Sequence, residues 1–122
     1  MPIIERLKNT YLLWHGIILH IPKQSRYTLG AKIDIIFIEI IEKVFSATGA
    51  AKIEKLPYLL AASQKLDTLK FLLLIAWEIK ILDNKKYILI SEPLNEIGRM
   101  LGGWHRKIAN ETPAEYAGEK RQ

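Results

Sequence analysis

The sequence predicts an all-α protein that folds as an antiparallel, up-down-up-down four-helix bundle. Apolar residues recur every three or four positions in four separate segments, which is the period of a helix with one buried face. The connections between these segments are short, so consecutive helices are expected to run antiparallel. With 122 residues and 49% hydrophobic content, the chain is large enough for one domain with a core of its own.

The first helix is expected over residues 4–21, and Pro22 ends it because the residue before a proline is disfavoured in the helical conformation. Its apolar stripe consists of Ile4, Leu7, Tyr11, Trp14, Ile18 and Ile21. Ser25 is the expected N-cap of the second helix, and Thr48 and Gly49 close it. The stripe of this second helix consists of Leu29, Ile33, Ile36, Ile40, Val44 and Ala47.

The third helix is expected to begin between Lys52 and Pro57, and the fourth to be capped by Asp83 or Asn84. The third stripe consists of Leu59, Ala62, Leu66, Leu69, Leu73 and Ala76. The fourth consists of Tyr87, Ile90, Leu94, Ile97, Leu101, Trp104 and Ile108. Pro93 falls inside this last pattern, but the stripe stays in phase across it. One kinked helix is therefore expected there rather than two.

The bundle is expected over residues 1–109, and a flexible C-terminal tail over residues 110–122, which are polar and show no stripe. The absence of cysteine excludes disulfides and thiolate metal sites and favours the cytoplasm. The first residues make a poor signal peptide. The longest apolar run, 71–77, is far shorter than the roughly 18 residues of a membrane span. A cytoplasmic protein without a membrane partner is expected.

The second and third helices carry more apolar residues than one core can use. The surplus residues are Ile35, Phe37, Ile38, Ile41, Phe45, Phe71, Leu72, Leu74, Ile75, Trp77 and Ile79. A helix that is apolar almost all round is buried on more than one side. This favours a homo-oligomer, whose interface is expected at Phe37, Ile41, Phe71 and Leu74. The alternative is an irregular bundle that wraps these helices more fully.

Three glycines interrupt the otherwise regular fourth helix, at Gly98, Gly102 and Gly103. Glycine inside a helix costs roughly 1 kcal/mol against alanine, so its repeated use indicates close packing of another helix or a ligand. Gly98 and Gly102 are four residues apart and share one face. The alternative is that Gly102 and Gly103 only loosen the end of the helix.

The residues that carry catalysis are hard to find, and a non-catalytic protein is expected. The three histidines form no pair at the spacing of metal ligands on a helix, and no cysteine joins them. Glu92 and Glu96 lie one turn apart, but a metal site in a bundle needs matching ligands on facing helices. There is no glycine-rich phosphate loop between a strand and a helix. Neither a metal nor a cofactor is predicted.

The formal charge of +5 and the sequence pI near 9.5 are typical of a protein with an anionic partner, although ordinary solubility charge is the alternative. Basic residues are spread along the predicted bundle. Such a pattern can follow a phosphate backbone without reading its sequence. The predicted nucleic-acid contacts are Arg99, Arg106 and Lys107, with Arg26 and Lys32.

Three blocks of the sequence carry a resemblance to a known family. They are residues 25–30 (SRYTLG), 66–73 (LDTLKFLL) and 96–104 (EIGRMLGGW). In this order and at these separations they resemble the family of four-helix-bundle proteins that includes Avd, the accessory variability determinant of diversity-generating retroelements. The similarity runs from about residue 11 to residue 107. A more distant resemblance is to the bundle proteins encoded in intervening sequences of bacterial ribosomal RNA genes.

The resemblance implies an antiparallel four-helix bundle that assembles into a basic pentameric barrel, binds RNA or DNA and associates with a reverse transcriptase. On this analogy the chain is a non-catalytic accessory subunit. Lys32 and Lys70 stand where the family often has arginine, and Leu74 replaces a frequent arginine. These departures weaken the basic surface. The alternative function is an oligomeric scaffold for protein–protein interaction without nucleic-acid binding.

Overall fold

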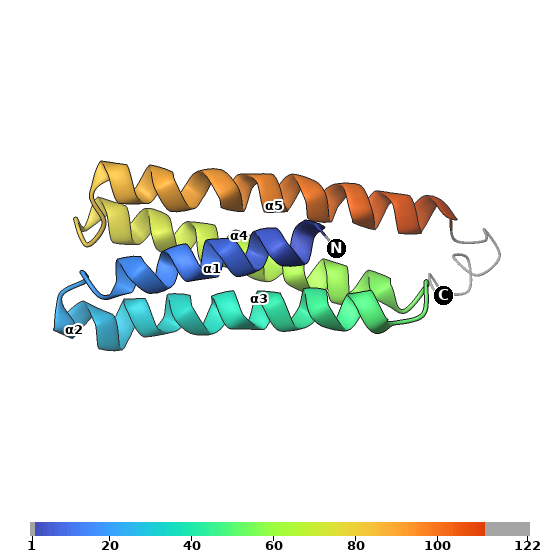
Figure 1. Cartoon of the computed structure of the whole chain (residues 1–122), viewed down its shortest axis with the longest axis horizontal. Coiled ribbons are helices and arrows are strands. Elements are labelled where there is room, and N and C mark those ends of the chain that lie inside the picture. The colour runs from blue at the N-terminus through green and yellow to red at the C-terminus, as the bar shows by residue number, and fades with distance from the viewer. Residues whose placement is uncertain (1, 112–122) are drawn as a thin grey trace.

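The computed structural model describes residues 2–111, which form an antiparallel four-helix bundle (Figure 1). The long helices are α1 (Pro2–Ile18), α3 (Ala31–Gly49), α4 (Lys55–Glu78) and α5 (Asn84–Glu111). Two short elements, α2 (Lys23–Ser25) and the π-helical η1 (Arg26–Gly30), lead directly into α3. The predicted fold class is confirmed. Most of the expected tail, residues 112–122, lies outside the described residues, while residues 110 and 111 belong to α5.

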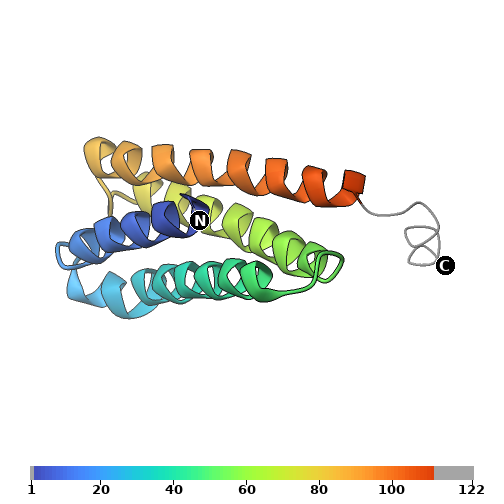
Figure 2. The ribbon, with the colours of Figure 1, turned by 45° about the vertical axis from the view of Figure 1, so that its right-hand side comes forward.

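The helices pack in the order α1, α3, α4, α5, and α1 also contacts α5. Helix α1 has 17 residues and α5 has 28, so at 1.5 Å per residue they are about 26 and 42 Å long. Helix α1 therefore runs beside only part of the bundle, as Figure 2 shows. The α1–α2 and α4–α5 connections lie at one end of the molecule, and the α3–α4 connection lies at the other (Figure 1).

The core is a single apolar cluster to which all four long helices contribute. Every residue of the predicted α4 stripe is buried, as are most residues of the α3 and α5 stripes. The stripe of α1 differs from the prediction at every second position: Leu7, Trp14 and Ile21 are buried as predicted, but Ile4, Tyr11 and Ile18 are half-buried, and the residue before each of these three is buried instead. Its buried members are Ile3, Leu7, Thr10, Trp14 and Ile17. Thr10 enters the core because its Oγ1 donates a hydrogen bond of 2.7 Å to the carbonyl oxygen of Arg6, which satisfies the hydroxyl.

The predicted N-cap at Ser25 is wrong, because the second helix already begins at Lys23 and the Ser25 side chain caps no backbone N–H. Pro22 occupies the N-cap position, and its carbonyl accepts the first bond from the Arg26 N–H at 2.9 Å. A proline that ends one helix thus begins the next. The widened π turn follows. At its end a Cβ on Gly30 would lie 3.2 Å from the Ser25 carbonyl oxygen, so this position favours glycine.

Helix α5 begins as predicted, since Asp83 Oδ1 accepts the backbone N–H of Lys86 at 2.8 Å. It continues as one helix through Pro93. At the other end of the molecule, Lys55 Nζ donates to the Ala47 carbonyl at 2.7 Å and lies 5.9 Å from the centre of the Trp104 ring. This one ammonium group joins the end of α3 to α4 and α5.

Two hydrogen bonds to the Asp34 side chain, which we call the polar tie, fix α1 against α3. Asp34 Oδ1 accepts hydrogen bonds from the Tyr11 hydroxyl at 2.9 Å and from Trp14 Nε1 at 3.2 Å. The Phe37 ring packs against both aromatic rings, with centroids 5.7 Å from Tyr11 and 6.4 Å from Trp14. Phe37 is 0% exposed, so its predicted place in an oligomer interface is wrong. The aromatic residues of α1 thus cover Phe37 within a single chain.

Within residues 2–111, no helix combines the length and the apolar character needed to cross a membrane.

Candidate nucleic-acid interface

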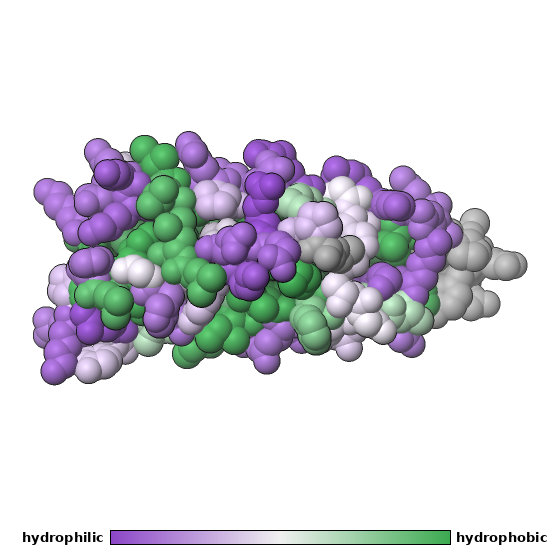
Figure 3. All heavy atoms as spheres, viewed as in Figure 1, coloured by the Kyte–Doolittle hydropathy of each residue, from purple (hydrophilic) through white to green (hydrophobic). Residues whose placement is uncertain are grey.

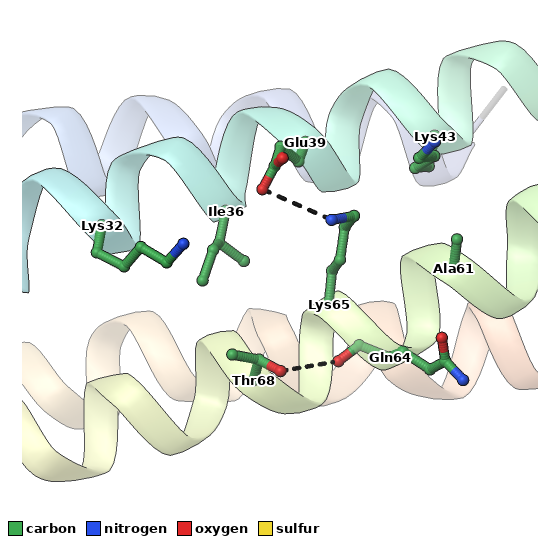
Figure 4. Close-up of a pocket in the computed structure, with 8 residues that line it drawn as sticks. All are labelled: Lys32, Ile36, Glu39, Lys43, Ala61, Gln64, Lys65 and Thr68. Atoms are coloured by element: carbon green, nitrogen blue, oxygen red, sulfur yellow. Dashed lines mark hydrogen bonds and ion pairs between the residues drawn. The ribbon is translucent and has the colours of Figure 1, made fainter.

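A basic groove runs between α3 and α4 and has a volume of about 520 Å³ (Figure 4). Its lining residues are Lys32, Ile36, Glu39, Lys43, Ala61, Gln64, Lys65 and Thr68. On each helix these positions recur every three or four residues, which places them along one flank. The sequence therefore builds the groove from two adjacent helix faces that run antiparallel to each other.

The charge of this groove is positive. It contains three lysines, and Glu39 is the one acidic residue among those that line it. Glu39 Oε1 lies 3.6 Å from Lys65 Nζ, so part of one positive charge is compensated. The ammonium of Lys32 extends into the space between the helices in Figure 4. Lysines at such positions can contact phosphate groups but read no base, because the contact is the same for every nucleotide.

A second groove, of about 370 Å³, lies between α4 and α5. Its lining residues are Ser63, Leu66, Asp67, Lys70, Asn95, Gly98 and Arg99. The Arg99 guanidinium is largely exposed, and its Nη2 lies 2.6 Å from Glu96 Oε2. The hydrogen bond from Arg99, together with its charge, lowers the pKa of the Glu96 carboxyl. Arg99 is thus exposed on the rim of this groove, with a carboxylate beside it.

Gly98 lies where α5 meets the Lys70 side chain. A Cβ at Gly98 would be 3.2 Å from Lys70 Nζ and 3.5 Å from Leu66 Cδ2, so the glycine allows the lysine to cross over it. At Gly102 and Gly103 the nearest atoms belong to Arg106 of the same helix, at 3.4 and 4.0 Å. No atom of another described helix of the same chain lies within 4 Å of a Cβ at these two positions, so close packing there stays a prediction about a second copy or a ligand.

The predicted basic contacts do not form one cluster. Lys32 lies in the α3–α4 groove and Arg99 on the rim of the α4–α5 groove, while Arg106 and Lys107 are exposed near the end of α5. Arg26 does not behave as a phosphate contact in the described structure. Its Nη2 donates to two backbone carbonyls near the end of α1, those of Leu19 at 3.2 Å and Ile21 at 3.1 Å.

The guanidinium of Arg26 therefore satisfies carbonyl groups that the end of a helix leaves without partners, and its role is structural. Sequence reasoning missed Lys43 and Lys65, which line the α3–α4 groove together with Lys32. A signal for Lys43 was present, since Lys32, Glu39 and Lys43 are spaced by seven and four residues and so share one helix face. The position of Lys65 depends on how α4 is placed beside α3, which spacing alone does not give.

Apolar side chains are also exposed. In Figure 3 a hydrophobic band crosses the viewed face over α5, α1 and α3. Of the predicted interface residues, Phe71 is 60% exposed, and Ile41 and Leu74 are half-buried. The other exposed large apolar residues of the helices and their connections are Leu12, Leu19, Tyr27, Ile35, Ile38, Phe45, Leu60, Trp77, Ile79, Ile88 and Leu89. Such a surface exceeds a scatter of single apolar residues.

No group of three or more histidine, aspartate or glutamate side chains within residues 2–111 is arranged to hold a metal ion.

An antiparallel bundle with basic grooves on both flanks of one helix defines the class of small, basic helical-bundle proteins. The comparison with protein families assigns the chain within that class. The bAvd-like family matches residues 2–108, which include all four long helices up to the last turn of α5. The chain therefore belongs to the bAvd-like family. None of the curated proteins matches it.

Proposed function

We propose that this protein is a non-catalytic, homo-oligomeric accessory subunit that binds RNA or DNA in the cytoplasm and associates with the reverse transcriptase of a diversity-generating retroelement. Membership in the bAvd-like family supports the accessory role. The observation that carries nucleic-acid binding is the α3–α4 groove, in which Lys32, Lys43 and Lys65 are opposed by one carboxylate. Arg99, Arg106 and Lys107 extend the basic surface along α5.

The mechanism of binding is the neutralisation of phosphates by ammonium and guanidinium groups. Each neutralised phosphate releases condensed counterions, so the logarithm of the affinity falls with the logarithm of salt concentration by about 0.9 per phosphate on duplex DNA and about 0.7 on single strands. The groove lines up cations along two helices and offers no helix that would read base edges. Binding should therefore depend strongly on salt and little on sequence.

A homo-oligomer, most simply a pentamer as in the family resemblance, accounts for the exposed apolar side chains. Of the predicted interface residues, Phe71 supports this proposal best because 60% of it is exposed on the outer face of α4. Ile41 and Leu74 contribute from half-buried positions, while the interface excludes the buried Phe37. Light scattering coupled to size-exclusion chromatography measures the mass. A monomer at micromolar concentration would contradict the proposal.

The test of nucleic-acid binding is a fluorescence-anisotropy titration at several salt concentrations, with two triple variants whose oligomer mass has been checked. Lys32→Gln, Lys43→Gln and Lys65→Gln remove the cations of the groove. We expect this variant to bind more weakly and with a salt slope smaller by about two to three.

The matched variant carries Arg99→Ala, Arg106→Ala and Lys107→Ala, and it removes the same formal charge from α5 instead. We expect a smaller effect, because Arg99 is paired with Glu96 and the three residues line no common groove. A larger effect in this second variant would move the interface to α5. No measurable binding by the parent at low salt would favour the alternative function, an oligomeric scaffold for protein–protein interaction.

A further inference from the structure

A hollow of about 580 Å³ lies at the turn between α4 and α5, away from the α3–α4 groove. Its lining residues are Trp77, Glu78, Lys80, Leu82, Asp83 and Asn84. The volume is within the usual range for small-molecule sites in proteins. The lining combines an aromatic ring, an amide and a cation, which can serve the base and the phosphate of a nucleotide, with the two carboxylates of Glu78 and Asp83.

The Trp77 indole is fixed in position before any ligand arrives. Its Nε1 donates a hydrogen bond of 2.6 Å to Asn84 Oδ1. Its ring stacks on Tyr87, with centroids 5.3 Å apart and planes inclined by 17°. Tyr87 is not among the residues that line the hollow. The part of the indole that lines it is therefore a part that Tyr87 does not cover. The side chain is 37% exposed and therefore offers an ordered aromatic surface to solvent.

Lys80 adopts a backbone conformation that normally favours glycine. Its φ is 66°, and it is the only non-glycine residue with positive φ in the described part of the chain. It ends α4 in a Schellman motif, in which the Ile81 N–H bonds to the Ala76 carbonyl at 2.8 Å and the Lys80 N–H bonds to the Trp77 carbonyl at 3.0 Å. The motif accounts for the positive φ, and it places the Lys80 side chain in the lining of the hollow.

The hollow and the α4–α5 groove lie on the same side of the two helices. Trp77 follows Lys70 by seven residues, which is close to two helical turns and about 10 Å along α4. Asn84 precedes Asn95 by eleven residues, close to three turns of α5. Lys70 and Arg99 at the groove could therefore hold phosphates of the same strand whose base reaches the hollow.

We infer that the hollow at the α4–α5 turn binds an unpaired nucleobase of a single-stranded nucleic acid, which stacks on Trp77 while Lys80 contacts an adjacent phosphate. This inference rests on the proposed nucleic-acid binding and adds a preference for single strands. Every base has an aromatic face, so stacking tolerates any sequence. A paired base is not available for it. The Asp83 carboxylate caps α5 through the Lys86 N–H, and Lys86 Nζ lies 4.0 Å from its second oxygen, so its charge is partly compensated.

The experiment measures the affinity of the full chain for a single-stranded oligonucleotide, a duplex of the same length and a nucleoside monophosphate. We expect Trp77→Leu to weaken single-strand binding roughly five- to 150-fold, the change that corresponds to about 1–3 kcal/mol of stacking per base. Duplex binding should change less than twofold. Trp77→Phe should restore most of the single-strand affinity because it keeps an aromatic face, and quenching of tryptophan fluorescence by the single strand should be largely lost in Trp77→Leu.

Lys80→Gly is a second test, because its two expected effects would not occur together if Lys80 had only a structural role in this turn. Glycine relieves the positive φ, so the melting temperature should rise while single-strand affinity falls. Tyr27→Leu is the matched control, because Tyr27 is an exposed aromatic residue under Lys23 Nζ, which lies 6.0 Å from its centroid, and it does not line the hollow. We expect this control to bind like the parent.

Four outcomes would overturn the inference. They are unchanged single-strand affinity in Trp77→Leu, an equal loss on single strand and duplex, equal affinity for the monophosphate and the strand, and a change of oligomer mass in Trp77→Leu. The third would make the hollow a site for free nucleotides, and the fourth would assign Trp77 to a contact between copies. Failure of the proposed function is distinguishable, because the parent would then bind neither strand nor duplex at low salt.

Discussion

The substitution Asp34→Ala tests whether the hydrogen bonds to the Asp34 carboxylate hold α1 in place against α3. Its Oδ1 is the acceptor for the indole N–H of Trp14, which is 0% exposed, and for the hydroxyl of the half-buried Tyr11. A buried donor left without an acceptor costs about 1–3 kcal/mol, and the loss of the second hydrogen bond adds about 1 kcal/mol. We expect Asp34→Ala to lower the free energy of unfolding by about 3 kcal/mol.

For a chain of this size, that loss corresponds to a fall in melting temperature of about 10 °C. Thermal melts followed by far-UV circular dichroism, at one fixed protein concentration, measure it. Asp34→Asn keeps a carbonyl acceptor and should lose less than half as much. Asp67→Ala is the matched control on the exposed flank of α4 and should stay within about 0.5 kcal/mol of the parent. Equal melting temperatures for Asp34→Ala and the control would refute the reasoning.

The same tie predicts a dependence on alkaline pH. Burial raises the pKa of the Tyr11 hydroxyl above its ordinary value of 10.0, and the hydrogen bond to Asp34 and its negative charge add to the shift. The folded protein therefore keeps the Tyr11 proton more tightly than the unfolded chain. The resulting stabilisation is complete below about pH 10 and is lost as the pH rises from there through the raised pKa. The parent should lose more stability than Tyr11→Phe in this window.

Two further predictions concern faces of single helices. Phe37→Glu should abolish cooperative unfolding, because it places a charge in the core. Phe71→Glu should instead keep its helical circular dichroism and lower the oligomer mass. A folded Phe37→Glu variant would contradict the assignment of Phe37 to the core. Gly98→Leu should destabilise the protein by about 1–3 kcal/mol, because its Cβ would lie 3.5 Å from Leu66 Cδ2 and the rest of the leucine would crowd Leu66 and displace the Lys70 side chain. Gly102→Ala should instead stabilise it by up to about 1 kcal/mol, and paired thermal melts compare the two; a destabilised Gly102→Ala variant with lower mass would place Gly102 at a contact between copies.

The helices could be predicted from the sequence because their apolar period is regular over many turns. The α4 stripe is buried at every predicted position, and Asp83 caps α5 as its residue type indicates. The prediction for the first helix is wrong at Ile4, Tyr11 and Ile18, which are half-buried while the residue before each is buried. One of those preceding residues, Thr10, is polar by type and enters the core only through its bond to the Arg6 carbonyl. Spacing cannot reveal such a local exception to polarity.

The candidate interface was harder to predict, because it depends on which helices are neighbours and on what each cation already contacts. Arg26 looks like an available cation in the sequence, yet its guanidinium is bonded to carbonyls at the end of α1. Lys65 lies on a different helix from Lys32 and Lys43, and only the packing of α4 on α3 brings the three together. The basic residues of the sequence therefore indicate binding to phosphate groups, but they do not show which face of the bundle would bind them.

The position of α4 connects binding with assembly. Lys65 lines the groove on one flank of α4, and Lys70 lines the groove on the other. Five residues of helix rotate the chain by about 140°, so the two lysines lie on opposite sides of the buried stripe, and Phe71 lies on the outer face between them. A nucleic acid that used both grooves of one chain would have to cross that outer face, where the proposed contact with a second copy also lies. If Phe71 is covered by a neighbouring copy, the two grooves must serve different segments of nucleic acid, and dissociation by Phe71→Glu should change the number of nucleotides bound per chain as well as the mass.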